Sequence, residues 1–552
     1  MSAVTAAPPL GTRAAPGRGG TTLTGTWSQV RFILRRDRVR LLVWSLAIPA
    51  LYLASLAEYT TLADDPEGMQ ARAALVQTPA MVSMTGPGYG TDDYTVGAAV
   101  SNELVLWMVL ALAVMSIMQV VRHTRAEEES SRAELVRAAA VGRHAAVVAA
   151  LVVVLVVNLV VAALSSAVLI GSGLEVVDSV AVSLGVAMSA MTFGAIALVA
   201  AQVTEHSRGA TGLSMAALGA AFTLRTIGDM QQMHGSWVSW LSPIAWAQQM
   251  RAYVDLRWWP AALGAVVIVL LLVVASALAS RRDFGAGLVP DRPGRADAHP
   301  SLRGPAVLVW VQQRMALLWT ALGLAFMWFA TGTIVDQISS MTASLADNPV
   351  YASVLGTGEV TKAFVGIIVL YAALGAAAYG IVAALRAKSE EEAGRAEYVL
   401  ATPVSRSRWL GASLGVTSVG TVVVLVTGVL ALAAGAAVAG AQDVTSGEIT
   451  EAGLLYLPAL AVFVGFAAAL FAWAPKASSL VWLLLEYTIL VSLFADLFHL
   501  PEWARKISPF WWVPNPLTGD VDAVHVAGLC AVALVLFLLA FAGFRRRDVA
   551  TK

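Results

Sequence analysis

Residues 145–170 read AAVVAALVVVLVVNLVVAALSSAVLI and contain no charged side chain. A helix needs about 20 predominantly apolar residues to cross the hydrocarbon core of a bilayer, so this stretch is long enough to span it. Residues 104–121 form a second run of this kind. Only helices and closed barrels satisfy their backbone inside a bilayer, and neither run alternates as a barrel strand does. The sequence therefore predicts an all-α polytopic membrane protein.

Composition leads to the same class of protein. Of the 552 residues, 58% are hydrophobic and 13% are charged, whereas soluble domains average about 25% charged residues. The 36 basic and 36 acidic residues balance, so no nucleic-acid partner is expected. A single cysteine, Cys530, excludes an intrachain disulfide. Residues 1–25 are rich in Pro, Gly, Thr and Ala, and we interpret them as a disordered cytoplasmic tail rather than a signal peptide.

Twelve apolar segments are predicted to span the membrane. They centre on residues 41–57, 103–121, 145–170, 180–201, 212–227, 261–279, 315–334, 363–385, 411–438, 454–473, 480–497 and 524–544. Placing both termini in the cytoplasm leaves all but seven of the basic residues in cytoplasmic tails and loops, and we adopt this orientation. Upstream of the first span, basic and apolar residues alternate over 27–40, which predicts an amphipathic helix in the inner interface.

The second half of the chain repeats the first. Glu127, Glu128 and Glu129 recur as Glu390, Glu391 and Glu392, at a constant separation of 263 positions. The motifs that follow them recur at the same separation, and Ser242, Pro243 and Trp246 recur as Ser508, Pro509 and Trp512. Arg38 matches Arg314, and residues 281–283 match residues 546–548. We therefore expect a first six-helix repeat at 26–282, a cytoplasmic linker at 283–305 and a second, parallel six-helix repeat at 306–552, with a pathway between the repeats.

Each acidic loop has the periodicity of a short surface helix. Each loop contains an i,i+4 pair of a glutamate followed by an arginine, which is the favourable order. The pairs are Glu128 with Arg132 in the first loop and Glu391 with Arg395 in the second. Three adjacent carboxylates do not suit an anionic membrane surface. A solvated helix whose acids balance nearby arginines is one interpretation. The occurrence of the triplet in both halves favours the other, a docking site for a basic groove on a cytoplasmic partner.

These features together resemble the permeases of ATP-binding-cassette transporters of the ABC-2 type (type V exporter-like). Within them, the chain is similar to the duplicated twelve-span group described as exporters of polyketide antibiotics (tetronasin-resistance type). The matching features are the interfacial helix, the Glu-Glu-Glu-x-x-Arg-Ala-Glu loop, the Ser-Pro segment and the stretch RRDFGAGL at 281–288. The resemblance covers about residues 25–550, and the order and duplication of the motifs carry it.

The resemblance implies roles for particular residues. It makes 127–137 and 390–400 the coupling helices that contact the ATPase, with the residues Glu127, Glu128, Glu129, Arg132, Glu134, Glu390, Glu391, Glu392, Arg395 and Glu397. It makes the Trp-rich Ser-Pro segments an outer gate, with the residues Ser242, Pro243, Trp246, Ser508, Pro509 and Trp512. The alternative interpretation of these Trp-rich segments is an ordinary aromatic belt on a surface loop.

ATP hydrolysis is expected on a separate subunit. The sequence has no G-x-x-x-x-G-K-[ST] phosphate loop, and the Gly-rich stretch 86–90 lacks a lysine. We therefore expect no enzyme activity, cofactor or metal on this chain, with ATP and Mg on two copies of an ATPase partner. The expected cargo is hydrophobic or amphipathic, such as an antibiotic, a drug or a lipid. The expected location is the bacterial cytoplasmic membrane.

A charged residue falls inside the fifth predicted span and another inside the eleventh, at related positions of the two repeats. Arg225 in the fifth span and Glu486 in the eleventh are candidates for lining the pathway, because intramembrane charges usually face a cavity or a partner. Direct pairing of the two is a second interpretation. Arg225 lies near the outer end of its span, whereas Glu486 lies nearer the middle.

Two other protein classes remain as alternatives. A secondary transporter of the major facilitator type also has two parallel six-span repeats, but its loop between spans two and three is usually basic. A membrane glycosyltransferase would place catalytic acids in the first outer loop, where this chain has Asp64, Asp65, Asp92 and Asp93. Such enzymes lack this duplication.

Overall fold

The computed structural model describes residues 22–63, 66–130, 141–142, 144–283, 285–289, 297, 299–333, 335–336, 357–494, 500–519 and 522–548. Every regular element among these residues is helical. Ten of the helical segments are long and apolar enough to cross a membrane. They are Arg38–Thr60, Val96–Glu129, Ala145–Gly171, Val176–Val203, Trp259–Ser280, Pro305–Gly332, Thr361–Glu392, Arg406–Ala439, Ser446–Trp473 and Ala523–Arg546. The prediction of a helical, multi-pass membrane protein is confirmed.

The fifth and eleventh predicted spans fall on α11 (Ser207–Gln231) and α22 (Val481–Phe494), which are not among these ten. α11 carries Arg225 and Asp229, which lower its mean hydropathy, and α22 has only 14 described residues. The predicted range 212–227 was too short at both ends. The helix continues through Arg225, because the protein buries this side chain instead of exposing it to solvent.

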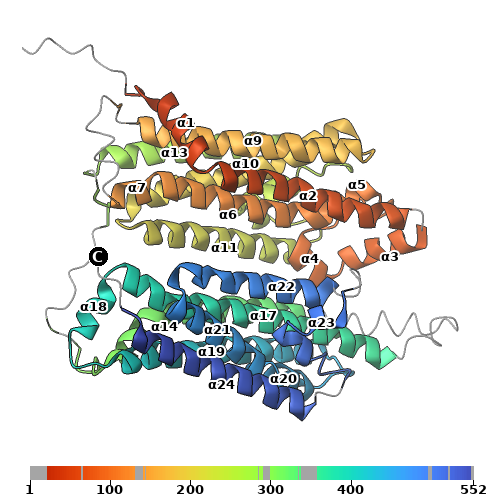
Figure 1. The fold of residues 1–552 in the computed structure, drawn as a ribbon. Helices are drawn as coiled ribbons and strands as arrows, with labels where there is room; N and C mark the ends of the chain where they lie inside the picture. The colour runs from red at the N-terminus through yellow and green to blue at the C-terminus, as the bar shows by residue number, and fades with distance from the viewer. Residues whose placement is uncertain are drawn as a thin grey trace, which may run out of the picture. The chain divides into compact units, whose positions relative to one another are not determined.

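The chain forms two compact units, Met1–Pro293 and Gly294–Lys552, which we call unit 1 and unit 2 (Figure 1). In unit 1, α10 (Val176–Val203) packs against α6, α9 and α13. Small buried residues such as Ser183 and Gly185 let its neighbours approach closely. The other helices of unit 1 are α1 (Thr26–Arg36), α2 (Arg38–Ala63), α3 (Pro66–Val76), α4 (Pro79–Thr85), α5 (Val96–Ala99), η1 (Val100–Leu104), α6 (Val105–His123), α7 (Arg125–Glu129), α9 (Ala145–Gly171), η2 (Ser239–Leu241), α12 (Pro243–Gln248) and α13 (Trp259–Ser280).

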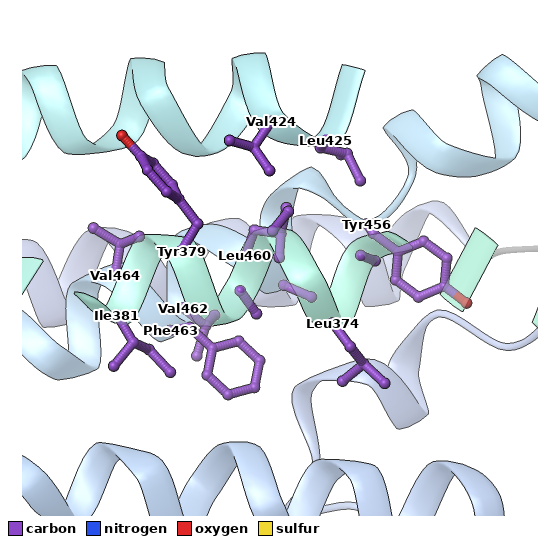
Figure 2. Packing of buried hydrophobic residues seen from close by; sticks show 14 of the residues in the cluster. Leu374, Tyr379, Ile381, Val424, Leu425, Tyr456, Leu460, Val462, Phe463 and Val464 are labelled. Atoms are coloured by element: carbon purple, nitrogen blue, oxygen red, sulfur yellow. The ribbon is translucent and has the colours of Figure 1, made fainter. Parts of the chain in front are cut away.

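Unit 2 has its core between α17, α19 and α21, where Tyr379, Leu425 and Phe463 are among the buried side chains (Figure 2). Gly332 on α14 and Gly435 on α19 face each other so closely that a side chain on either would collide with the opposite backbone. The helices of unit 2 are α14 (Pro305–Gly332), α17 (Thr357–Glu392), α18 (Arg395–Leu400), α19 (Arg406–Ala439), α20 (Ser446–Leu454), α21 (Leu457–Trp473), η3 (Pro475–Leu480), α22 (Val481–Phe494), α23 (Glu502–Arg505), η4 (Pro509–Trp512) and α24 (Ala523–Arg546).

The predicted amphipathic helix is present but ends early. α1 buries Val30 and Ile33 and leaves Trp27 and Phe32 exposed, which is the expected division into two faces. It stops at Arg36 instead of continuing to residue 40. Asp37 interrupts the helix, because its carboxylate is buried against α6.

Candidate functional site

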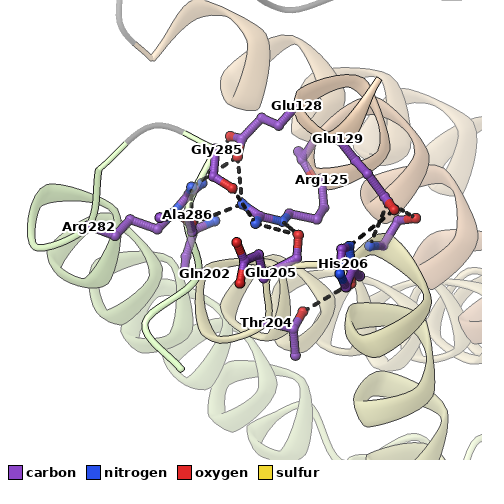
Figure 3. A network of polar contacts seen from close by, with 12 residues as sticks. Arg125, Glu128, Glu129, Gln202, Thr204, Glu205, His206, Arg282, Gly285 and Ala286 are labelled. Atoms are coloured by element: carbon purple, nitrogen blue, oxygen red, sulfur yellow. Dashed lines mark hydrogen bonds and ion pairs between the residues drawn. The ribbon is translucent and has the colours of Figure 1, made fainter. Parts of the chain in front are cut away.

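The first glutamate triplet lies where α6 continues into α7, and its middle member is directed into the protein (Figure 3). The Glu128 side chain is only 13% exposed. Its carboxylate accepts hydrogen bonds from Nη1 and Nη2 of Arg282, both at 2.9 Å, and from Nη1 of Arg125 at 2.8 Å. Hydrogen bonds between charged groups at these distances are about twice as strong as neutral ones. Glu128 therefore stabilises unit 1 from within.

Arg125 joins three segments that are distant in sequence. Its side chain is almost completely buried, and it donates hydrogen bonds to the backbone carbonyls of Glu205, Gly285 and Ala286 (Figure 3). The segment that follows α13 is fixed here as well. The backbone N–H groups of residues 288 and 289 donate to carbonyls at the end of α10, at 3.1 and 3.0 Å. The first part of the predicted linker thus packs on unit 1.

Unit 2 has an ion pair at the matching sequence positions. Glu391 is buried and its Oε2 lies 2.5 Å from Nη2 of Arg547, the residue that follows α24. Glu391 occupies the last turn of α17, where the helix dipole disfavours a negative charge. The cation of Arg547, which also lies over the rings of Phe471 and Phe544, offsets that penalty. We call the pairs Glu128–Arg282 and Glu391–Arg547 the triplet clamps.

The predicted i,i+4 pair between Glu391 and Arg395 is wrong. Gly394 has a φ of 72°, a left-handed conformation that ends the helix between the two residues. Arg395 instead binds Glu390 through two hydrogen bonds of 2.8 and 2.9 Å. In unit 1, Arg132 and Glu134 lie outside the described residues, and with them the pair between Glu128 and Arg132.

The outer members of each triplet remain more accessible than the middle one. Glu129 is 39% exposed and accepts hydrogen bonds from the backbone and side chain of Ser207. Glu392, its counterpart, is 66% exposed. The first member of each triplet is partly exposed and forms an ion pair with an arginine. Glu127 pairs with Arg36, and Glu390 pairs with Arg395. Glu397 lies on α18 and is half-buried. The accessible negative charge of the triplets is therefore concentrated on Glu129 and Glu392.

A buried polar cluster joins α1 to α6 beside this site. Asp37 lies 2.7 Å from Nε2 of His123 and accepts hydrogen bonds from Gln119 and Arg122 at 3.2 and 3.1 Å. Burial alone would raise the pKa of Asp37, but the hydrogen bonds and charges of His123 and its neighbours outweigh it and lower the pKa below the usual aspartate value. This cluster was not predicted, because a single Asp among arginines has no recognisable spacing.

The two Ser-Pro segments share one local geometry. Trp246 donates from Nε1 to the backbone carbonyl of Trp240 at 2.8 Å, and Trp512 donates in the same way to that of Lys506 at 2.9 Å. In both cases the acceptor lies six residues earlier in the chain. Each segment holds a buried serine before a proline that begins a short helix, with the residues Ser242, Pro243, Ser508 and Pro509. Their role as a gate stays a prediction.

The two predicted pathway charges differ in their surroundings. Arg225 is fully buried, donates to the carbonyls of Val82 and Ser83 on α4 at 3.2 and 2.6 Å, and lies 3.5 Å from Asp229. These contacts all lie within unit 1. Glu486 is exposed on α22. Their role in a pathway stays a prediction, as does their pairing.

A buried carboxylate that was not predicted lies near the start of the second apolar segment, beside the first predicted outer loop. Glu103 lies in the π-helical turn η1, is buried, and is held by Arg72 at 2.8 Å and by the hydroxyl of Tyr94 at 2.9 Å. Asp92 and Asp93, the acids of the glycosyltransferase alternative, are exposed, and Asp64 and Asp65 lie outside the described residues. Among the described residues no group of three or more His, Cys, Asp or Glu is placed to hold a metal ion.

Comparison with known proteins identifies the family. The family model for the multidrug efflux system permease Rv1217c, C-terminal domain, matches residues 28–281 and again residues 302–545. The chain is also 34% identical over 553 residues to the multidrug efflux system permease protein Rv1217c of Mycobacterium tuberculosis (strain ATCC 25618 / H37Rv), and the alignment covers 98% of both chains. With its apolar helices, the chain belongs to the family of membrane-spanning multidrug efflux permeases represented by Rv1217c.

Proposed function

We propose that this chain is the membrane-spanning subunit of an ABC-2 type exporter, of the duplicated group that resembles the polyketide antibiotic exporters. It moves hydrophobic or amphipathic compounds outward across the bacterial cytoplasmic membrane. The observation that carries the proposal is the arrangement at the two glutamate triplets. In both units the middle glutamate is bound internally by an arginine after the last helix, while the third glutamate stays accessible.

The proposed architecture is twelve spans in two parallel six-helix repeats, with both termini in the cytoplasm. Three observations support it. One family model matches each half of the chain, the tryptophan hydrogen bond recurs in both Ser-Pro segments, and so does the triplet clamp. α11 and α22 complete the count of twelve.

We propose one docking surface on each unit, at Glu129 in unit 1 and at Glu392 and Tyr398 in unit 2. Tyr398 on α18 is 80% exposed, and exposed tyrosines next to charged groups are common centres of protein interfaces. Exposed carboxylates complement a basic groove and guide its approach. The clamps would pass movement on to the membrane helices, because each one joins a triplet to the end of the last helix of its unit.

The ATPase is proposed to be a separate protein, present in two copies, that holds the ATP and Mg. The chain itself needs no cofactor in this scheme. Its contribution is to receive the conformational change at the triplets and to open a pathway to the outside, with the Ser-Pro segments as the outer gate. Glu486 is proposed to line the pathway. Arg225 is proposed to shape it by holding α11 against α4.

The relationship to an efflux permease does not favour a glycosyltransferase. It leaves the energy source to be tested against the major facilitator alternative. A transporter of that type would move cargo in response to a proton gradient and without a partner. An ABC-2 permease would require the ATPase and ATP, so reconstitution separates the two classes.

The docking proposal is tested by co-purification with a tagged ATPase. The variant Glu129→Lys/Glu392→Lys reverses the two accessible charges and is expected to lose the ATPase. The control Glu67→Lys/Glu451→Lys makes the same change of charge at exposed glutamates in predicted outer loops, and should retain it. Equal recovery of the ATPase with both double variants would refute docking at the triplets.

A further inference from the structure

A cavity in unit 2 lies beside the second triplet and is not needed for the function proposed above. Its volume is about 260 Å³, and it opens between the start of α14, the end of α17, α18 and the start of α19. The apolar part of its wall includes Leu308, Val309 and Trp409. The polar part includes Gln313 and Arg386.

Gln313 is an unusual residue for this wall. Its side chain is 3% exposed, and its Oε1 has no hydrogen-bond partner in the part of the chain that the structure describes. A buried polar atom without a partner is costly to the folded state, so such atoms are rare unless a ligand or water satisfies them. A ligand that donates a hydrogen bond would remove this cost.

Arg386 adds a positive charge that no carboxylate among the described residues neutralises in an ion pair. Its described contact is one hydrogen bond from Nη1 to the carbonyl of Gln312 at 2.8 Å, and among the described residues it forms no ion pair. The second arginine of the wall, Arg395, is already neutralised by Glu390. The cavity therefore carries a net charge of about +1 and favours an anion.

In unit 1, the protein's own side chains satisfy the groups at the positions that correspond to Gln313 and Arg386. By the repeat separations of 276 and 263, Gln313 corresponds to Asp37, and Arg386 to His123. In unit 1 the carboxylate of Asp37 accepts from His123 and its neighbours. In unit 2 an amide replaces that carboxylate, which leaves both a cation and an acceptor unused.

We propose that this cavity binds the headgroup of an anionic glycerophospholipid with a free hydroxyl, such as phosphatidylglycerol. The phosphate would pair with Arg386, and a headgroup hydroxyl would donate to Oε1 of Gln313. The acyl chains would follow the exposed apolar side of α14, which carries Trp310 and Val311. Basic pockets between the ends of membrane helices are typical sites for such headgroups. The proposal rests on the proposed function only in placing this end at the inner leaflet.

The test uses the purified full-length permease without the ATPase, so that it does not depend on coupling. Native mass spectrometry would compare retention of phosphatidylglycerol with that of phosphatidylcholine, which has a phosphate but no hydroxyl donor and no net charge. Wild type is expected to retain phosphatidylglycerol preferentially. Arg386→Gln should weaken retention about tenfold, the usual effect of losing one charged hydrogen bond.

Two further variants separate binding from folding. Arg314→Gln removes an exposed arginine next to Gln313 in sequence and is expected to retain the lipid as wild type does. Gln313→Glu keeps the side-chain shape but supplies the missing carboxylate, so it should neutralise Arg386 and release the lipid without lowering the unfolding temperature.

Three results would overturn the proposal. The first is equal loss of lipid in Arg386→Gln and Arg314→Gln. The second is occupation by soluble glycerol 3-phosphate with no preference for phosphatidylglycerol, which would assign the site to a free phosphate compound. The third is retention of phosphatidylglycerol by Arg386→Gln at the wild-type level, which would show that Arg386 does not bind the headgroup.

Discussion

Replacing Glu128 by Gln tests whether the middle glutamate holds unit 1 together. The change keeps the shape of the side chain but removes the charge that faces Arg125 and Arg282. Both guanidinium groups are largely buried, with side chains 1% and 8% exposed. Removing one partner of a buried pair costs about 3–5 kcal/mol. The remaining amide oxygen still accepts a hydrogen bond, so we expect a loss of about 2 kcal/mol.

That loss should lower the midpoint of thermal unfolding in detergent by about 4 °C, because 1 kcal/mol corresponds to about 2 °C in a unit of this size. Glu392→Gln is the matched control, since its carboxylate is largely exposed and contributes about 0–1 kcal/mol. It should unfold as wild type does. An unchanged midpoint for Glu128→Gln, or an equal loss in Glu392→Gln, would refute the division of the triplet into internal and accessible members.

Three further substitutions test other parts of the structure. Asp37→Asn removes the negative charge beside His123 but keeps an oxygen that can accept a hydrogen bond. Because the pKa of Asp37 is lowered in the fold, the contribution of its charge to stability is present at neutral pH and is lost progressively as the pH falls below about 4. The unfolding temperature of wild type should therefore exceed that of Asp37→Asn by more at pH 7 and pH 5 than near pH 3. An equal difference at all three pH values would contradict this. Arg225→Leu leaves Asp229 buried without a cation and should cost about 3–5 kcal/mol, seen as a sharp loss of folded protein on size-exclusion chromatography; a normal profile would exclude a structural role. Glu486→Gln should change the efflux of at least one transported compound if this exposed charge lines the pathway, and unchanged transport of every compound would remove it from the pathway.

Much of the fold could be predicted because membrane helices leave a strong signal. Residues 145–170 are apolar along their whole length, and the helix there is Ala145–Gly171. The prediction was weakest at α11, where contacts within unit 1 offset the charges that the helix carries. α11 carries Arg225 and Asp229 in its last two turns, and these two charges are compatible with a helix only because they face each other and the carbonyls of α4. The mean hydropathy of a segment does not reveal whether its charged side chains contact each other or backbone carbonyls.

The sequence indicated the two glutamate triplets as a candidate site but did not reveal which side chains bind them. The constant separation of the triplets indicated one candidate docking surface in each unit. It did not reveal that Arg282 and Arg547 bind the middle glutamates, although both arginines belong to a motif that repeats. The helical spacing of Glu391 and Arg395 suggested a pair that does not form, because a local rule of this kind fails when Gly394 ends the helix.

The central claim is that a separate ATPase drives transport through this chain. The most direct test is export of a fluorescent hydrophobic compound from proteoliposomes that contain the permease with or without the ATPase, in the presence of ATP and without a proton gradient. Transport is expected only when permease, ATPase and ATP are all present, and an uncoupler of proton gradients should leave it unchanged. Movement of the compound by the permease alone, driven by an imposed proton gradient, would contradict the claim.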